Sequence, residues 1–261
     1  MDACAETDPL VPRFAGDSMI RRVHAEGVLL LGGGRALLMQ IAHPAVARGV
    51  AEHSSFQRDR IGRLLRTLRP TLPIVFGSHA QAAEAARAIR RTHARVAGEG
   101  YAASDPALLL WVWATLVDTA LLMHSLFVRP LRQDEAEAYL ADMRAVGRAL
   151  GIPSAHLPAD LASFRAYVDA TLTELTVGAQ ARAIARAIFD PGPILGPVMW
   201  GLRLLTAALL PAKMRAGFGL GEARLASRAL RYAAPAARRL LPIVPRPLRA
   251  PPWFLLPPRA V

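Results

Sequence analysis

The sequence of 261 residues predicts an all-α fold, built as a single globular multi-helix domain of about ten helices. Apolar residues recur three to four positions apart along most of the chain, and no segment alternates apolar and polar residues as a half-buried strand does. Hydrophobic residues make up 53% of the chain, enough to bury a core and to exclude a disordered body. Cys4 is the only cysteine, which excludes a disulfide scaffold, a Cys-ligated zinc site and an iron–sulfur cluster.

The elements follow from this periodicity together with start and stop signals. Pro44 suits the first turn of one helix, and Asp105–Pro106 is a start signal for a long one. Gly98 and Gly100 are predicted to close an earlier helix. The predicted helices span residues 20–39, 44–53, 60–68, 79–97, 106–127, 133–150, 159–176, 178–189, 194–210 and 221–233.

Charge and proline divide the chain into three parts. We expect an N-terminal extension over residues 1–19, a helical domain over 20–234 and an extended Pro/Arg-rich tail over 235–261, where repeated prolines should prevent a regular helix. The net charge is +12, of which residues 191–261 carry +10 from ten arginines, Lys213 and Glu222. The tail also contains the apolar anchors Trp253, Phe254 and Leu255.

The basic tail predicts a partner. Its mixture of arginine and apolar residues favours peripheral contact with an anionic membrane surface, because each basic residue near such a surface contributes roughly 1 kcal/mol. No recognition helix or zinc module supports nucleic-acid binding. The alternative is that the tail wraps the domain and its arginines pair with surface acids. The sequence leaves the oligomeric state open.

Two segments approach the length of a membrane span. Residues 107–127 hold Asp118 near their centre, which favours a buried core helix. Residues 194–212 hold Arg203 and two prolines, which favours a packed or surface-lying helix. The first 18 residues are acidic and lack the basic-then-apolar pattern of a secretion signal, so we expect a cytoplasmic protein, peripheral on the membrane at most.

His93 is the most suggestive of the seven histidines. It continues a helical stripe that contains Ala82, Ala86 and Ile89, and small side chains beside an imidazole leave room for a flat group. A neutral imidazole there could ligate a haem iron. The alternative is a core histidine bonded to a backbone carbonyl.

Other candidates form two clusters. Arg63 and Thr67 are four residues apart, so a guanidinium and a hydroxyl share one face and could hold a carboxylate or polarise dioxygen; the alternative is a solvated basic face. His43, Glu52 and His53 lie around the helix over 44–53. His43 and His53 are ten residues apart, too far to ligate one metal from one straight helix, and no Glu-x-x-His spacing supports a two-metal carboxylate bundle.

Asp118 lies within a strongly apolar helix and therefore needs a partner. It could orient a ligand histidine, take part in proton transfer, or pair with a buried arginine.

Six runs in this order carry a family resemblance: residues 32–44 (GGGRALLMQIAHP), 50–54 (VAEHS), 62–67 (GRLLRT), 90–96 (RRTHARV), 110–118 (LWVWATLVD) and 164–168 (FRAYV). Over about residues 20–240 the chain resembles the MpaB-type oxygenase-like family, which is related more distantly to the rubber oxygenase called latex clearing protein.

The resemblance implies an all-helical fold enclosing a pocket for haem b, with His93 as the iron ligand and His43 as a further cofactor-binding residue. Arg63 and Thr67 match an Arg-x-x-x-Thr pattern that lines the haem pocket of the rubber oxygenase. Glu52 is the candidate for that enzyme's distal glutamate, and Arg66 stands where a lysine can occur there.

The function so implied is a haem-dependent oxygenase that uses dioxygen on an unsaturated apolar substrate, an isoprenoid or lipid, with Arg63, Thr67, Glu52 and Asp118 as catalytic candidates. The rivals are a non-catalytic haem carrier or sensor, and a membrane-surface structural protein.

Overall fold

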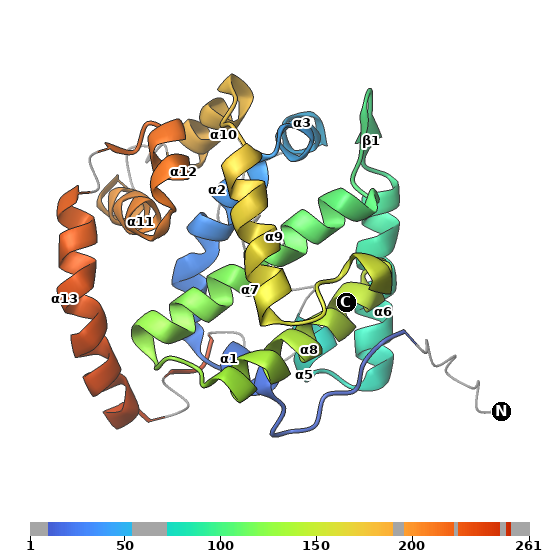
Figure 1. Cartoon of the computed structure of the whole chain (residues 1–261), viewed down its shortest axis with the longest axis horizontal. Coiled ribbons are helices and arrows are strands. Elements are labelled where there is room, and N and C mark those ends of the chain that lie inside the picture. Colours follow the sequence, from blue (N-terminus) through green and yellow to red (C-terminus); the bar gives the residue numbers. More distant parts are fainter. Residues whose placement is uncertain (1–9, 54–71, 190–195, 222–223, 246–248, 252–261) are drawn as a thin grey trace.

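A computed structural model describes residues 10–53, 72–189, 196–221, 224–245 and 249–251, and the regular secondary structure of this part of the chain is almost entirely helical (Figure 1). The all-α prediction is therefore confirmed. In chain order the elements are α1 (Met19–His24), η1 (Gly27–Gly32), α2 (Gly33–Ala42), α3 (Pro44–His53), α5 (Leu72–Phe76), α6 (His79–Ala94), β1 (Ala97–Gly98), β2 (Tyr101–Ala102), α7 (Pro106–Phe127), α8 (Gln133–Ala149), η3 (Ser154–His156), α9 (Leu161–Glu174), α10 (Ala179–Phe189), α11 (Gly196–Leu209), α12 (Ala212–Gly217), α13 (Arg224–Leu240) and η5 (Leu241–Ile243).

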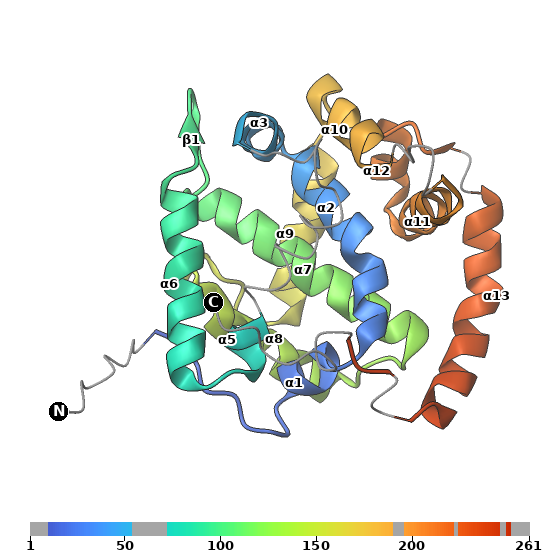
Figure 2. The same ribbon diagram turned by 180° about the vertical axis from the view of Figure 1, so that it is seen from behind.

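Helix α7 crosses the middle of the molecule in both Figure 1 and Figure 2. It begins as the sequence predicts, with Pro106 in its first turn and the Asp105 carboxylate accepting the amide N–H of Ala107 at 2.8 Å. Within the described residues, α7 is the one helix long and apolar enough to cross a membrane, and most of it is buried inside the protein. The prediction of a core helix over residues 106–127 is confirmed.

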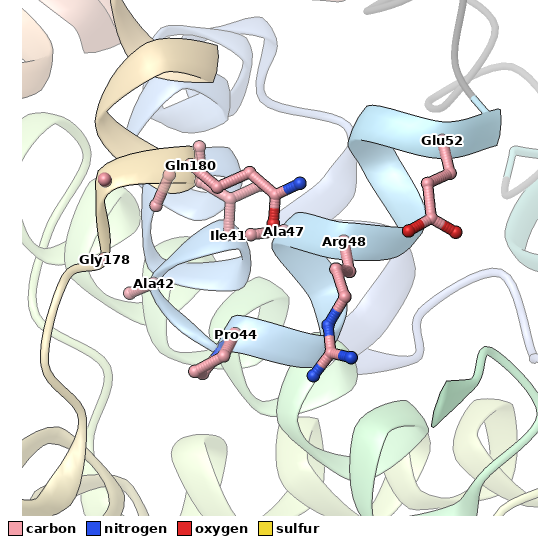
Figure 3. Close-up of a pocket in the computed structure, with 10 residues that line it drawn as sticks. Ile41, Ala42, Pro44, Ala47, Arg48, Glu52, Gly178 and Gln180 are labelled. Carbon is pink, nitrogen blue, oxygen red and sulfur yellow. The ribbon is translucent and has the colours of Figure 1, made fainter. Parts of the chain in front are cut away.

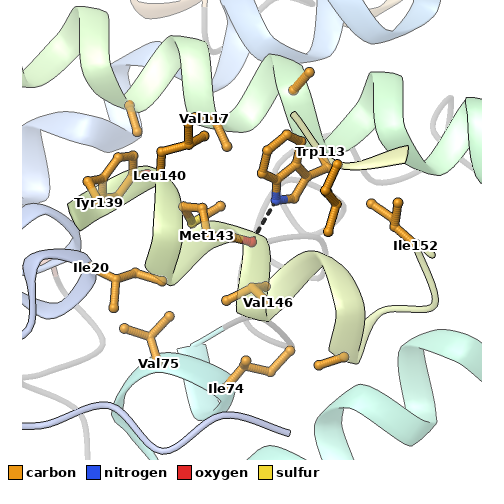
Figure 4. Close-up of a cluster of buried hydrophobic side chains, with 14 of the residues drawn as sticks. Ile20, Ile74, Val75, Trp113, Val117, Tyr139, Leu140, Met143, Val146 and Ile152 are labelled. Atoms are coloured by element: carbon orange, nitrogen blue, oxygen red, sulfur yellow. Dashed lines mark hydrogen bonds between the residues drawn. The ribbon is translucent and has the colours of Figure 1, made fainter. Parts of the chain in front are cut away.

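A hydrophobic core on one side of α7 is built with α1, α5, α6, α8 and α9 (Figure 4). Trp113 illustrates how the polar atom in this core is satisfied. Its indole Nε1 donates to the carbonyl oxygen of Met143 on α8 at 2.8 Å, and its ring meets Phe164 of α9 edge-on at 5.9 Å between centroids. These contacts fix α8 and α9 against α7.

Helix α2 packs along α7 on another side, and three contacts order it. Met39 accepts the indole N–H of Trp111 through its carbonyl oxygen at 3.1 Å, and the Gln40 amide donates to the Thr115 hydroxyl at 3.1 Å. Gly32 lies so close to α7 that a Cβ there would come within 2.6 Å of a Thr119 methyl carbon. Gly32, directly before α2, therefore serves close packing against α7.

The predicted single helix over residues 20–39 is wrong, because this segment forms α1, η1 and α2 in succession. Gly27 explains the first break. A Cβ at this position would lie 2.7 Å from the carbonyl oxygen of Arg249, so the chain here accommodates a segment from the far end of the sequence.

Two further expectations need correction. The helix predicted over 79–97 ends at Ala94 and is followed by a short antiparallel hairpin, in which Gly98 pairs with Tyr101 and Gly100 takes a φ of +74°. Helix α13 continues through Pro235 to Leu240, so proline does not end helical structure there. Pro235 is exposed, and water can hydrate the carbonyl that its missing N–H leaves without an intrahelical donor.

The sequence reading also missed the short helices α5 and α12, whereas the helix over 44–53 is confirmed at both ends as α3. The helix predicted over 60–68 lies outside the described residues, as do the tail anchors Trp253, Phe254 and Leu255.

Candidate functional site

Helix α6 carries His93 on the face that the sequence stripe predicts to be inward. Ser78 caps the helix: its hydroxyl accepts the Gln81 N–H, and the Gln81 side chain accepts the Ser78 N–H. Ala82 and Ala86 are buried in the core, and Ile89 packs against it. His93, one turn further, is half-buried.

The imidazole of His93 has an unused ring nitrogen. Its Nδ1 is shielded from solvent and makes no hydrogen bond with any described residue. Burial lowers the pKa of His93, because the charged form loses hydration. His93 is therefore neutral at physiological pH with a lone pair available, which is the form that binds a metal.

His124 shows the alternative that the sequence left open for His93. It is buried in α7, and its Nδ1 lies 2.8 Å from the carbonyl oxygen of Arg129. This is a core histidine satisfied by the backbone. His93 differs in having no such partner among the described residues, although Nδ1 of His79, at the start of the same helix, shares that property.

The hairpin that follows His93 joins α6 to α3. The Tyr101 hydroxyl donates to the Glu52 carboxylate at 2.6 Å, and Nε2 of His53 lies 3.2 Å from the carbonyl oxygen of Ala97. The bond to Glu52 raises the pKa of Tyr101, so the phenol stays protonated. Arg48 donates to the carbonyl oxygen of Glu99 at 2.9 Å. The hairpin that follows His93 in the chain therefore contacts both Glu52 and His53 on α3.

His43 lies where α2 ends and α3 begins. Its Nδ1 accepts the backbone N–H of Ala45 at 3.3 Å, so in the neutral imidazole Nε2 carries the proton and can act as a hydrogen-bond donor. Burial lowers the pKa of His43, and the charge of Asp105 opposes this shift. His43 is therefore also neutral at physiological pH.

Beside these residues, an open groove of about 370 Å³ lies between α3 and the first turn of α10 (Figure 3). The Arg48 and Glu52 side chains lie on its α3 wall and Gln180 on its α10 wall. The remaining lining is mostly apolar and small. Of the candidate residues, Glu52 lines this groove, whereas His43 and His93 do not.

Asp118 stands apart from this region and has the partner that one of the three alternatives predicted. Nη2 of Arg35 on α2 lies 2.6 Å from its Oδ2. Asp105, which caps α7, lies close enough to His43 to influence its pKa. Asp118 lies thirteen residues further along, about 20 Å along the helix axis, and is therefore remote from the residues around His43.

In the structure, Glu52 and His53 contact the hairpin. His43 directly precedes α3, and His93 lies in the last turn of α6 before the hairpin. Asp118 is paired with Arg35, away from these residues. Arg63 and Thr67 lie outside the described residues. Two functional neighbours were missed. Tyr101 follows a Gly-Glu-Gly turn signal, and Arg35 is a lone charge in an apolar helix, the same signal that singled out Asp118.

Comparison with known proteins gives one family match. Residues 21–240 match the family described as ER-bound oxygenase mpaB/B'/rubber oxygenase, catalytic domain. Two uncharacterized proteins, from Mycobacterium bovis and Mycobacterium tuberculosis, are each 27% identical over 171 residues, covering 60% of this chain and 67% of theirs. No solved structure matches significantly.

Proposed function

We propose, because the chain belongs to the family of mpaB and rubber oxygenase catalytic domains, that it is a haem b-dependent oxygenase acting on an unsaturated apolar substrate. The family supports the oxygenase class. The haem, its ligand and the isoprenoid or lipid nature of the substrate are the parts we propose.

The observation that carries the haem proposal is the state of His93. A buried nitrogen without a hydrogen bond is unfavourable, since a buried polar group normally finds a partner. A ligand bond to iron would use the lone pair of a ring nitrogen of this neutral imidazole. Ala82 and Ala86 on the same face of α6 are packed into the hydrophobic core, about three and two turns before His93. The neutral imidazole with its unpartnered nitrogen therefore supports His93 as the residue that would hold the haem iron.

The bound haem would supply the redox chemistry that activates dioxygen. His93 would hold the group in place. The Tyr101 hydroxyl, on the hairpin that follows His93, donates to the Glu52 carboxylate at 2.6 Å, and we propose these two groups as the acid–base pair of the site. Arg63 and Thr67 are proposed to bind a haem propionate or orient dioxygen through the guanidinium and hydroxyl.

Asp118 is better explained as a counter-ion than as a proton donor. Its carboxylate is engaged by Arg35, and the same guanidinium donates to the Thr119 hydroxyl at 2.7 Å and to the carbonyl oxygen of Leu209 at 3.0 Å. This network joins α2, α7 and α11. We therefore propose that Asp118 serves the helix arrangement that supports the site.

Oxygen consumption separates this proposal from a haem carrier or sensor. The haem-loaded protein is reduced and placed with dioxygen, with and without an unsaturated isoprenoid such as squalene. An oxygenase consumes dioxygen in proportion to product only when substrate is present. Haem binding with no substrate-dependent consumption across saturated and unsaturated lipids would favour the carrier.

We also propose peripheral contact with an anionic membrane. On α11 the side chains of Val198 and Trp200 are 61% exposed, and Tyr232 on the surface of α13 is 81% exposed beside exposed arginines. Exposed aromatic residues next to arginine are typical of interfacial helices. Arg249 instead pairs with Glu26 at 3.5 Å, so this tail residue follows the alternative of a tail that pairs with surface acids.

A further inference from the structure

A second concave feature lies at the other end of the molecule from the hairpin. It is an open crevice of about 460 Å³, within the range of small-molecule sites, roughly 300–1,000 Å³. Helix α13 forms one wall at the edge of the molecule, beside α11 and the C-terminal part of α7 (Figure 2). None of the residues discussed for haem lines it.

The floor of the crevice is apolar. Leu122 and Leu126 are four residues apart on α7, so their side chains share one face. Leu209 at the end of α11 and Leu230 of α13 complete the floor. Three of these leucines, at positions 122, 126 and 230, are only half-buried, although they pack against a small apolar cluster. A hydrocarbon chain placed here would remove their remaining surface from water.

Three arginines line the same crevice, and no acidic residue of the described part of the chain does. Arg231 and Arg238 make no hydrogen bond or ion pair within the described residues, and Arg215 donates only to the Ser227 hydroxyl, at 3.2 Å. Elsewhere in the described chain the guanidinium groups of Arg35, Arg87 and Arg129 are paired with carboxylates. Among the residues that the structure describes, the crevice therefore concentrates positive charge without a counter-ion.

Most of the polar groups of the crevice lie toward one of its ends. Ser227 and Arg231 are four residues apart on one face of α13, and Arg215 reaches Ser227 from α12, so these three polar groups lie at one end. Arg238 lies two turns further along, about 10 Å along the helix axis. A polar end of this kind next to a leucine floor matches a molecule with an anionic head and an apolar chain.

We propose that this crevice binds a single-chain anionic amphiphile, with a carboxylate or phosphate head held by Arg215 and Arg231 and an alkyl chain lying over Leu122 and Leu126. Guanidinium groups form charge-assisted hydrogen bonds with both kinds of head. The site is independent of haem, and its occupation requires no oxygenase activity.

Isothermal titration of the full-length protein tests the proposal. Dodecyl phosphate and dodecanoate are titrated below their micelle concentrations, with dodecanol and inorganic phosphate as separate probes. We expect one site per chain for at least one of the two anionic amphiphiles, with affinity at least about tenfold above that of dodecanol or inorganic phosphate, because each of these lacks one half of the recognition. Equal affinity for inorganic phosphate would contradict an amphiphile site.

Matched variants locate the binding. Arg231→Gln should weaken dodecyl phosphate binding at least about fivefold, whereas Arg239→Gln, exposed on the same helix but outside the crevice, should leave it unchanged. Leu126→Gln should weaken binding while the far-ultraviolet circular dichroism stays that of the parent. Equal losses in Arg231→Gln and Arg239→Gln would mean general attraction to a basic surface and would overturn the proposal. The titration can be made with or without added haem, so its result does not depend on the oxygenase proposal.

Discussion

The Nη2 atom of Arg35 lies 2.6 Å from Oδ2 of Asp118, and the Arg35 side chain is only 6% exposed. Nη1 of the same guanidinium donates to the Thr119 hydroxyl, and its Nε donates to the carbonyl oxygen of Leu209. One side chain on α2 thereby binds α7 and the end of α11. The pair links segments 83 residues apart and fixes the helix that leads to His43.

Replacing Arg35 with methionine should lower the free energy of unfolding by about 3 kcal/mol, because the Asp118 carboxylate would stay partly buried without its counter-ion. Urea denaturation measures the change. The double variant Arg35→Met/Asp118→Leu should recover most of the loss, since it leaves no unpaired charge. A single variant as stable as the parent, or a double variant no better than the single one, would contradict this account.

The architecture was predictable where local signals agree with burial. Helix α7 combines a capping aspartate, Pro106 in the first turn and a continuous apolar run, so its bounds follow from the sequence. The break of residues 20–39 into α1, η1 and α2 was not predictable, because it depends on how closely Gly27 meets Arg249 and Gly32 meets Thr119. Those contacts join segments remote in sequence and leave no mark on local periodicity.

The candidate site was predictable in part for the same reason. The alanine stripe of α6 correctly indicated the inward face that leads to His93. The bond between Glu52 and Tyr101 depends on a hairpin of two-residue strands, too short to give an alternating pattern. For Asp118 the sequence could state the need for a partner but not choose Arg35, because both lie in helices whose packing partners are set by the whole fold.

Stability should depend on pH through His24. Its Nε2 lies 3.0 Å from the Tyr139 hydroxyl oxygen, and burial lowers its pKa from 6.5 to about 4. The unfolded chain therefore takes up this proton first, so the free energy of unfolding should fall as pH drops from about 6.5 toward 4, by on the order of 3 kcal/mol from this group.

Urea denaturation between pH 7.5 and 4.5 checks this. His24→Gln should flatten the decline, whereas His156→Gln, at an exposed position, should leave it unchanged. Identical pH profiles for the parent and His24→Gln would show that His24 does not titrate as proposed.

Arg63→Ala and Thr67→Ala should each weaken haem retention or slow the reaction of the reduced protein with dioxygen, without unfolding it. The reason is the shared face of a guanidinium and a hydroxyl four residues apart. Haem titration, stopped-flow mixing with dioxygen and circular dichroism measure the three properties. Parent-like haem affinity and oxygen reactivity in both variants would indicate that these residues belong to a solvated basic face and not to a haem pocket.

Membrane contact should be peripheral and sensitive to salt. In co-sedimentation, vesicles with anionic lipid should bind the full chain, and raising ionic strength should release it because exposed charges are screened. Trp200→Ser should reduce the bound fraction, and a chain ending at Pro251, which keeps the pair between Arg249 and Glu26, should lose the contribution of Trp253 and Phe254. Equal binding to neutral and anionic vesicles would contradict the proposal.

The most direct test of the central claim is the visible absorption spectrum of the protein reconstituted with hemin, compared among the parent, His93→Ala, His43→Ala and His79→Ala. We expect one haem b per chain with a Soret band in the parent, and loss of that band or of its ligand signature in His93→Ala. His79→Ala should keep the band. His79 also has a buried Nδ1 without a hydrogen bond, but it lies at the opposite end of α6. A parent spectrum in His93→Ala together with loss of haem in His43→Ala would contradict this expectation.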